Sequence, residues 1–279
     1  MVVMPESVTL SQRSDVIEVL EIDNEFATAS ISLWGAHMLS FEPKHDSRER
    51  LWVSETARFD GSKSIRGGIP VCWPWFGSRD DDLQAHGYAR KRYWRVINAS
   101  DEPLFTEITL ELTDTAGKGF DGSASLLLTI RVGDSLSVSL STENTGDTAF
   151  TYNGALHTYF DVLDINHTEL QGLSGDYSDK TQNWAILPTP EPYRFSEETD
   201  RIHLNPVGRV SIAQGDGKTT VDSVGHDSLV VWNPWAKRSA DLVDMTDDGY
   251  LGMLCVETAV TQGKTLEPGE VHVLEQTIS

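Results

Sequence analysis

The sequence predicts an all-β protein, and three observations support this fold class. Apolar and polar residues alternate with a period of two in several segments, and no long segment keeps a 3.6-residue period. Turn residues recur roughly every 8 to 12 positions, which is typical of a sandwich or a barrel. A parallel sheet with crossover helices would need helical segments between the strands.

The clearest expected strands form a hairpin. Apolar residues alternate over 126–132 and again over 136–140, on either side of the turn residues Gly133-Asp134. Similar alternation predicts a strand over 27–33, and short strands are expected at 105–112 and 228–232. Residues 251–260 form an almost continuous apolar run, which predicts a buried strand.

One continuous domain, spanning residues 1–279, is the simplest organisation. The chain has no internal repeat, no low-complexity tract and no linker rich in Pro, Gly or Ser, and all-β domains often exceed 200 residues. The segments 61–77, 175–200 and 215–226 are interpreted as long loops. Long loops on a rigid β scaffold commonly carry function.

The composition limits the partners. Hydrophobic residues make up 39% of the chain, which is enough for a sizeable core, and the formal net charge of −21 disfavours nucleic acid and anionic membranes. No export signal and no apolar run of about 18 residues is found. We therefore expect a cytoplasmic monomer in which Cys72 and Cys255 are buried, reduced thiols.

Positive charge is concentrated in residues 63–95. This segment contains seven Lys and Arg residues but only three acidic residues, the aspartates at 80–82. Three Trp and two Tyr lie in the same segment, and arginine forks beside aromatic rings suit a sugar that carries an anionic group. Arg66 precedes Gly67-Gly68, which permits close approach to a ligand. The alternative is that these cations form exposed ion pairs with the many surface acids.

An acid and a base are the second signal. Glu257 lies within the apolar run 251–260. Burial there would raise the pKa of its carboxyl group towards that of a useful base. Alternatively, because successive side chains of a strand point to opposite faces, Glu257 could point to solvent. His157 lies among small and apolar residues and could also be a structural core histidine. His86 follows Ala85 and precedes Gly87, which favours a loop site.

A base and an acid that flank the C1, O1 and O5 atoms of a sugar are what mutarotation requires. Glu257 would take the proton from O1 while His157 protonates the ring oxygen, and reclosure after rotation at C1 gives the other anomer. No metal and no organic cofactor is needed for this chemistry.

Six segments that span most of the chain resemble the aldose 1-epimerase superfamily, and in particular its hexose-6-phosphate mutarotase branch. These segments are Ser64-Ile-Arg-Gly-Gly-Ile-Pro-Val-Cys-Trp-Pro-Trp-Phe-Gly77, Ala85-His-Gly-Tyr-Ala-Arg90, Leu156-His-Thr-Tyr-Phe160, Thr199-Asp-Arg201, Val231-Trp-Asn-Pro-Trp235 and Cys255-Val-Glu257.

The resemblance implies a β-supersandwich of the galactose mutarotase type with a cleft across one sheet. It implies that Glu257 is the general base and His157 the general acid. It further implies that His86 holds the reacting oxygens, that Asp200 binds sugar hydroxyls, and that the phosphate is bound by Arg66 and Arg90. The expected partner is a small-molecule hexose 6-phosphate.

Three other functions compete with this one. A mutarotase for unphosphorylated aldoses would use the same acid and base, and a non-catalytic carbohydrate-binding protein would need neither. A cupin-like metal enzyme could use His86, His157 and Glu257 as ligands, but no closely spaced ligand motif such as H-x-H supports it.

Overall fold

The computed structural model describes residues 2–80, 82–204, 207–215 and 217–279. Strands dominate this part of the chain, which confirms the all-β prediction. The predicted hairpin is formed by β8 and β9. The helical elements are short: α1 (Trp235–Asp241) and the 3₁₀ turns η1 (Ala89–Lys91), η2 (Ile165–His167), η3 (Lys180–Gln182) and η4 (Gly249–Gly252).

Within the described residues the strands pair into three sheets, all through antiparallel ladders. The small sheet has the order β1 (Val8–Ser14), β2 (Ile17–Asp23), β3 (Ala27–Ser32), β4 (His37–Pro43). The sheet that we call the cleft sheet has the order β14 (Ala185–Pro188), β13 (Asp176–Asp179), β16 (Thr199–His203), β19 (Ser228–Asn233), β20 (Met253–Leu266), β10 (Phe150–Leu156), β5 (Val71–Cys72), with β11 (Tyr159–Asp161) also paired to β20.

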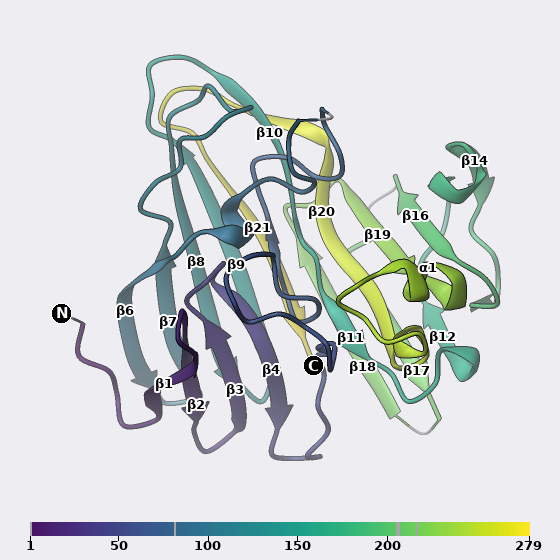
Figure 1. Ribbon diagram of the computed structural model, residues 1–279, viewed down its shortest axis with the longest axis horizontal. Helices are drawn as coiled ribbons and strands as arrows, with labels where there is room; N and C mark the ends of the chain where they lie inside the picture. Colours follow the sequence, from purple (N-terminus) through teal and green to yellow (C-terminus); the bar gives the residue numbers. More distant parts are fainter. Residues whose placement is uncertain (1, 81, 205–206, 216) are drawn as a thin grey trace.

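The sheet that we call the back sheet has the order β15 (Tyr193–Arg194), β12 (Thr168–Gln171), β17 (Arg209–Gln214), β18 (Gly217–Val224), β21 (Val271–Ile278), β9 (Leu136–Asn144), β8 (Ala124–Gly133), β7 (Phe105–Glu111), β6 (Arg95–Glu102). Figure 1 shows β1–β4 and β6–β9 in one half of the molecule and β14 and β16–β19 in the other, with β20 (yellow) crossing the middle.

Strand β20 divides its side chains between two environments. Leu254 and Val256 belong to the main hydrophobic core together with residues of the back sheet, such as Leu140 and Leu274. Successive side chains of a strand point to opposite faces. Cys255 and Glu257 therefore lie on the other face of the cleft sheet, where the functional cleft is found.

The interpretation of residues 215–226 as a long loop is wrong. Strand β18 occupies most of this segment and pairs with both β17 and β21. Its buried face carries Thr219, Val221 and Ser223, so two of the three inward residues are polar and the apolar alternation is hidden. The segment 175–200 also contains strands, β13, β14 and β15, whereas 61–77 is irregular apart from β5.

The loop that carries Arg66 is fixed by backbone contacts on both sides. The N–H of Gly68 donates to the carbonyl of Trp52 at 2.7 Å, and the carbonyl of Gly68 accepts from the N–H of Tyr159 at 2.9 Å. Buried His37 is hydrogen-bonded through Nε2 to the carbonyl of Gly67 at 2.6 Å. The position of Arg66 is therefore set by the backbone of β11 and its neighbours.

Three other expectations concern the chain as a whole. Cys72 and Cys255 are buried and free, as expected. Among the described residues, no helix has both the length and the apolar character that crossing a membrane requires. The single domain over residues 1–279 stays a prediction.

The first testable prediction concerns the close packing at Gly68. A Cβ atom there would lie 2.0 Å from the carbonyl oxygen of Met38, whereas at Gly77, which also has a positive φ, it would meet nothing within 4 Å. We expect Gly68→Ala to lower the free energy of unfolding by about 3 kcal/mol and Gly77→Ala by about 1 kcal/mol. Urea unfolding of both variants tests this, and equal losses would contradict the role of the close contact.

Candidate active site

A cleft of about 1090 Å³ opens on the cleft sheet. Its walls come from the loop 64–78, from residues 85–90 and from the segment that joins β13 to β14, while β16, β19 and β20 form its floor. The structure brings all six site residues predicted from the sequence into this cleft, namely Arg66, His86, Arg90, His157, Asp200 and Glu257. Their individual roles stay predictions.

His157 and Glu257 meet at the bottom of the cleft. His157 lies in the break between β10 and β11, where its N–H donates to the carbonyl of Pro70. Glu257 is paired across the ladder with Val230 of β19, and its side chain is only 1% exposed. The imidazole Nε2 and the carboxylate Oε1 are 3.4 Å apart.

Burial shifts both groups towards their neutral forms. The pKa of Glu257 is raised well above its ordinary value, first by burial and then by the charge of Asp200. The pKa of His157 is lowered well below its ordinary value, first by burial and then by Arg90 and Arg66. Both shifts favour the neutral pair, in which the shared proton resides on Glu257.

The other polar atom of each side chain is unsatisfied. Within the described residues, Oε2 of Glu257 and Nδ1 of His157 are buried and have no hydrogen-bond partner. Unsatisfied buried polar atoms are uncommon in folded proteins. Two such atoms on residues that line one cleft are typical of a site that a polar ligand completes.

His86 stands beside the pair in a left-handed backbone conformation, with φ 64°. Its ring meets that of His157 edge to face, with ring centroids 5.3 Å apart, and it also contacts Phe76. Burial, followed by the charge of Arg90, lowers the pKa of His86 well below its ordinary value. A neutral imidazole at this position can donate or accept a hydrogen bond at a sugar oxygen.

Arg66 is held by a buried carboxylate and a tyrosine. Its Nε donates to Oδ1 of Asp244 at 3.2 Å, and its Nη2 lies 3.2 Å from the same oxygen. Its Nη1 donates to the hydroxyl of Tyr159 at 3.0 Å, and the ring of Tyr159 is stacked on His157 with centroids 5.0 Å apart. Arg66 is thus connected through one side chain to the proposed acid.

The other two predicted binding residues have simpler surroundings. Arg90 donates from Nη2 to the carbonyl of Ala85 at 2.8 Å, and its Nε has no partner in the described part of the chain. Asp200 accepts from Nζ of Lys180 at 2.8 Å. Among the described residues, no hydrogen bond to Oδ1 of Asp200 is found.

Sequence reasoning assigned no role to several residues of the cleft. Tyr159 and Trp232 lie inside segments that carry the family resemblance, and both rings contact His157. Asp244 and Lys180 lie outside those segments. Asp244 follows Leu242 and Val243, whereas Lys180 lies in a polar stretch. Only the folded arrangement brings these two residues to Arg66 and Asp200.

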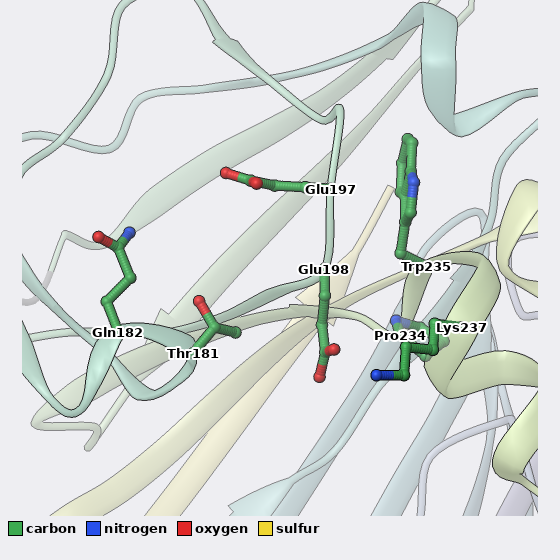
Figure 2. A pocket seen from close by; sticks show the side chains of 7 residues that line it. All are labelled: Thr181, Gln182, Glu197, Glu198, Pro234, Trp235 and Lys237. Atoms are coloured by element: carbon green, nitrogen blue, oxygen red, sulfur yellow. The ribbon is translucent and has the colours of Figure 1, made fainter.

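A smaller hollow of about 500 Å³ adjoins the cleft and shares Thr181, Glu198 and Lys237 with it. Figure 2 shows Glu197 and Glu198 projecting in different directions from one segment, across from the ring of Trp235. The acids of this hollow contrast with the arginines of the main cleft.

The structure also groups potential metal ligands differently from the metal-enzyme hypothesis. One ligand atom from each of His157, Cys255 and Glu257 lies within 4.8 Å of the others, so Cys255 takes the place that the hypothesis gave to His86. Burial, followed by the charge of Glu257, raises the pKa of Cys255 well above its ordinary value. This thiol is therefore protonated at neutral pH, which disfavours metal binding.

Comparisons with known proteins agree with this geometry. The chain is 36% identical over 261 residues to an Escherichia coli K12 protein that is provisionally named glucose-6-phosphate 1-epimerase, covering 91% of this chain and 87% of that one. A protein of the same provisional name from Cenchrus ciliaris is 34% identical over 259 residues, with 87% and 78% coverage.

Solved structures show the same fold. The crystal structure of YeaD from Salmonella typhimurium, provisionally described as a mutarotase, matches with a TM-score of 0.92 and 29% identity, covering 100% of this chain and 95% of that one. The structure of HI1317 matches with a TM-score of 0.84 and 30% identity, with 99% and 97% coverage. The predicted galactose mutarotase-like sandwich is thereby confirmed.

A family model described as aldose 1-epimerase matches residues 18–279. This match covers nearly the whole chain and includes every residue of the cleft named above. It confirms the resemblance predicted from the sequence: the chain belongs to the aldose 1-epimerase family.

Proposed function

We propose that this protein is a hexose-6-phosphate mutarotase that interconverts the α and β anomers of glucose 6-phosphate. The observation that carries the proposal is the pair of His157 and Glu257, 3.4 Å apart, in the same cleft as Arg66 and Arg90. An acid–base pair alone suits any aldose, and the two arginines supply the preference for a phosphorylated one. The names of the relatives support the same substrate.

The reaction needs two proton transfers in each direction. Ionised Glu257 takes the proton of the anomeric hydroxyl O1 while protonated His157 gives its proton to the ring oxygen O5, and the C1–O5 bond breaks to leave the open-chain aldehyde. After rotation at C1, His157 takes the proton back from O5 as that oxygen attacks C1, and Glu257 returns a proton to O1. Both residues end in their starting states.

The remaining residues orient the sugar. His86 lies beside His157 and would hold a reacting oxygen, and Asp200 would accept hydrogen bonds from ring hydroxyls. Arg66 and Arg90 would bind the phosphate through charge-assisted hydrogen bonds, which planar guanidinium groups form well. Trp232 adds an aromatic face to the cleft.

Catalysis is tested by anomer-exchange NMR on glucose 6-phosphate in the presence of a chelator. The purified protein is expected to accelerate exchange above the buffer rate. Glu257→Gln and His157→Asn should each lower turnover by about 10² or more with little effect on binding, because acid–base groups act mainly in the transition state. Unchanged exchange with folded wild-type protein would instead favour a carbohydrate-binding protein.

The pH dependence is tested at Lys180. Glu257 must be ionised to act as the base, and its pKa is raised by Asp200 and lowered by Lys180. Lys180→Met removes the lowering charge, so the fall in kcat/KM on the acidic side should begin at higher pH. Lys237→Met, which removes another exposed lysine of the cleft, is the matched control. An identical shift in both variants would show a general charge effect.

Substrate preference is tested at the arginines. A charge-assisted hydrogen bond contributes about 1.5 to 3 kcal/mol, so Arg66→Ala and Arg90→Ala should each lower kcat/KM for glucose 6-phosphate by about 10- to 100-fold. Activity on glucose should change far less. A wild-type ratio near one for the two sugars would point to a mutarotase for unphosphorylated aldoses.

A further inference from the structure

We propose that the phosphate of the substrate acts in the reaction as well as in binding: an anion held by Arg66 and Arg90 moves the proton of the catalytic pair from Glu257 to His157. The inference rests on the proposed function, because it requires the phosphate to be bound by these two arginines.

Arg66 is prepared to receive an anion in one orientation. Asp244, whose side chain is 8% exposed, accepts from Nε and Nη2, and the hydroxyl of Tyr159 accepts from Nη1. A guanidinium group has five N–H donors. One donor on Nη1 and one on Nη2 therefore have no partner among the described residues, and we expect these two donors to bind phosphate oxygens.

The same guanidinium group lies one side chain away from His157. The phenol of Tyr159 contacts Arg66 at its hydroxyl, and its ring covers the imidazole with an interplanar angle of 12°. Stacked rings exclude water from the space between the cation and the imidazole. A charge change at Arg66 is therefore only weakly screened at His157.

The two members of the catalytic pair respond differently to the arginines. Arg90 and Arg66 both lower the pKa of His157, whereas Arg90 but not Arg66 is among the causes that shift Glu257. A dianion that neutralises both arginines therefore raises the pKa of His157 more than that of Glu257. With one proton shared by the pair, this difference favours its transfer to His157.

The other groups around His157 do not reproduce this effect. Its ring faces Glu257 from β20 and His86 from the loop before η1, while Tyr159, Trp232 and Phe76 cover its remaining sides without charge. His37 also lowers the pKa of His157, but only as a minor cause. The arginines are the charged groups that both affect His157 and suit a phosphate.

The transfer produces the form that the reaction uses. Ionised Glu257 can accept the proton of O1, and protonated His157 can donate to O5, whereas the neutral pair can do neither in these roles. Bound phosphate should therefore raise kcat as well as lower KM. A free anion should also activate a substrate that lacks the phosphate, by a factor on the order of ten, which is a usual strength of coupling between two sites.

The experiment uses xylose with sulfate. Xylose has no C6 group, so the anion position stays open, and sulfate is a dianion that exchanges no proton near neutral pH and adds no buffer catalysis. Enzymatic anomer exchange of xylose is measured by NMR with sodium sulfate against sodium chloride at equal ionic strength. Competition of sulfate with glucose 6-phosphate is measured in parallel.

Wild-type protein is expected to show roughly tenfold faster xylose turnover at saturating sulfate. The double variant Arg66→Gln with Asp244→Asn should lose this activation and should already turn xylose over faster without sulfate, because the charge that lowers the pKa of His157 is gone. The second substitution leaves no buried carboxylate without a partner. Arg209→Ala, which breaks an exposed pair with Asp222, is the matched control and should keep the activation. A ¹⁵N spectrum of His157, assigned with His157→Asn, should move towards the imidazolium form when sulfate is added.

The outcomes separate the two proposals. If sulfate competes with glucose 6-phosphate but changes neither xylose turnover nor the spectrum of His157, this inference is wrong and the proposed function stands. If activation persists in the double variant, the coupling through Arg66 is wrong. If neither sulfate nor the phosphate group of the substrate affects binding, the phosphate site of the proposed function fails, and this inference fails with it.

Discussion

The burial of a carboxyl group in the middle of a hydrogen-bonded strand is the constraint on which the site depends. Glu257 cannot turn to solvent, because β20 is paired with β19 on one side and with β10 and β11 on the other. The opposite face of β20 belongs to the core, so a shift of register would bury the charge there. The sheet thereby fixes both the position of Glu257 and its raised pKa, and the break between β10 and β11 places His157 opposite it.

Local signals in the sequence were sufficient for the fold class and for most of the residues gathered in the cleft, whereas Asp200 was named only through the family resemblance. Alternation identified strands such as β8 and β9, and an acid in an apolar run marked Glu257. The sequence was insufficient where the structure or role of a residue depends on tertiary contacts. The buried face of β18 carries Thr219 and Ser223, and hence its segment was misread as a loop. Asp244 and Lys180 acquire a role only through partners that lie 178 and 20 positions away, at Arg66 and Asp200 respectively.

The overall charge and the local charge of the protein act in opposite directions on a phosphorylated sugar. A net charge of −21 repels an anion at long range, but this repulsion is screened beyond roughly 8 Å at physiological ionic strength. Inside the cleft, at distances of a few ångströms and beside the low-dielectric interior of the protein, the positive charges of Arg66 and Arg90 are much less screened. The protein can therefore be acidic overall and still bind an anion, provided that its cations lie within a few ångströms of the phosphate.

Rigid placement of Arg66 makes such binding efficient. A free arginine side chain loses up to about 2 kcal/mol of conformational entropy when a ligand fixes it, but Asp244 and Tyr159 hold this one before any ligand arrives. The backbone hydrogen bonds of Gly68 to Trp52 and Tyr159 fix the loop beneath it. Tyr159 belongs to the same strand pair that positions His157. The separation between Arg66 and the acid–base pair is consequently set by the sheet itself, so that a phosphate bound at Arg66 would orient the anomeric carbon in the same event.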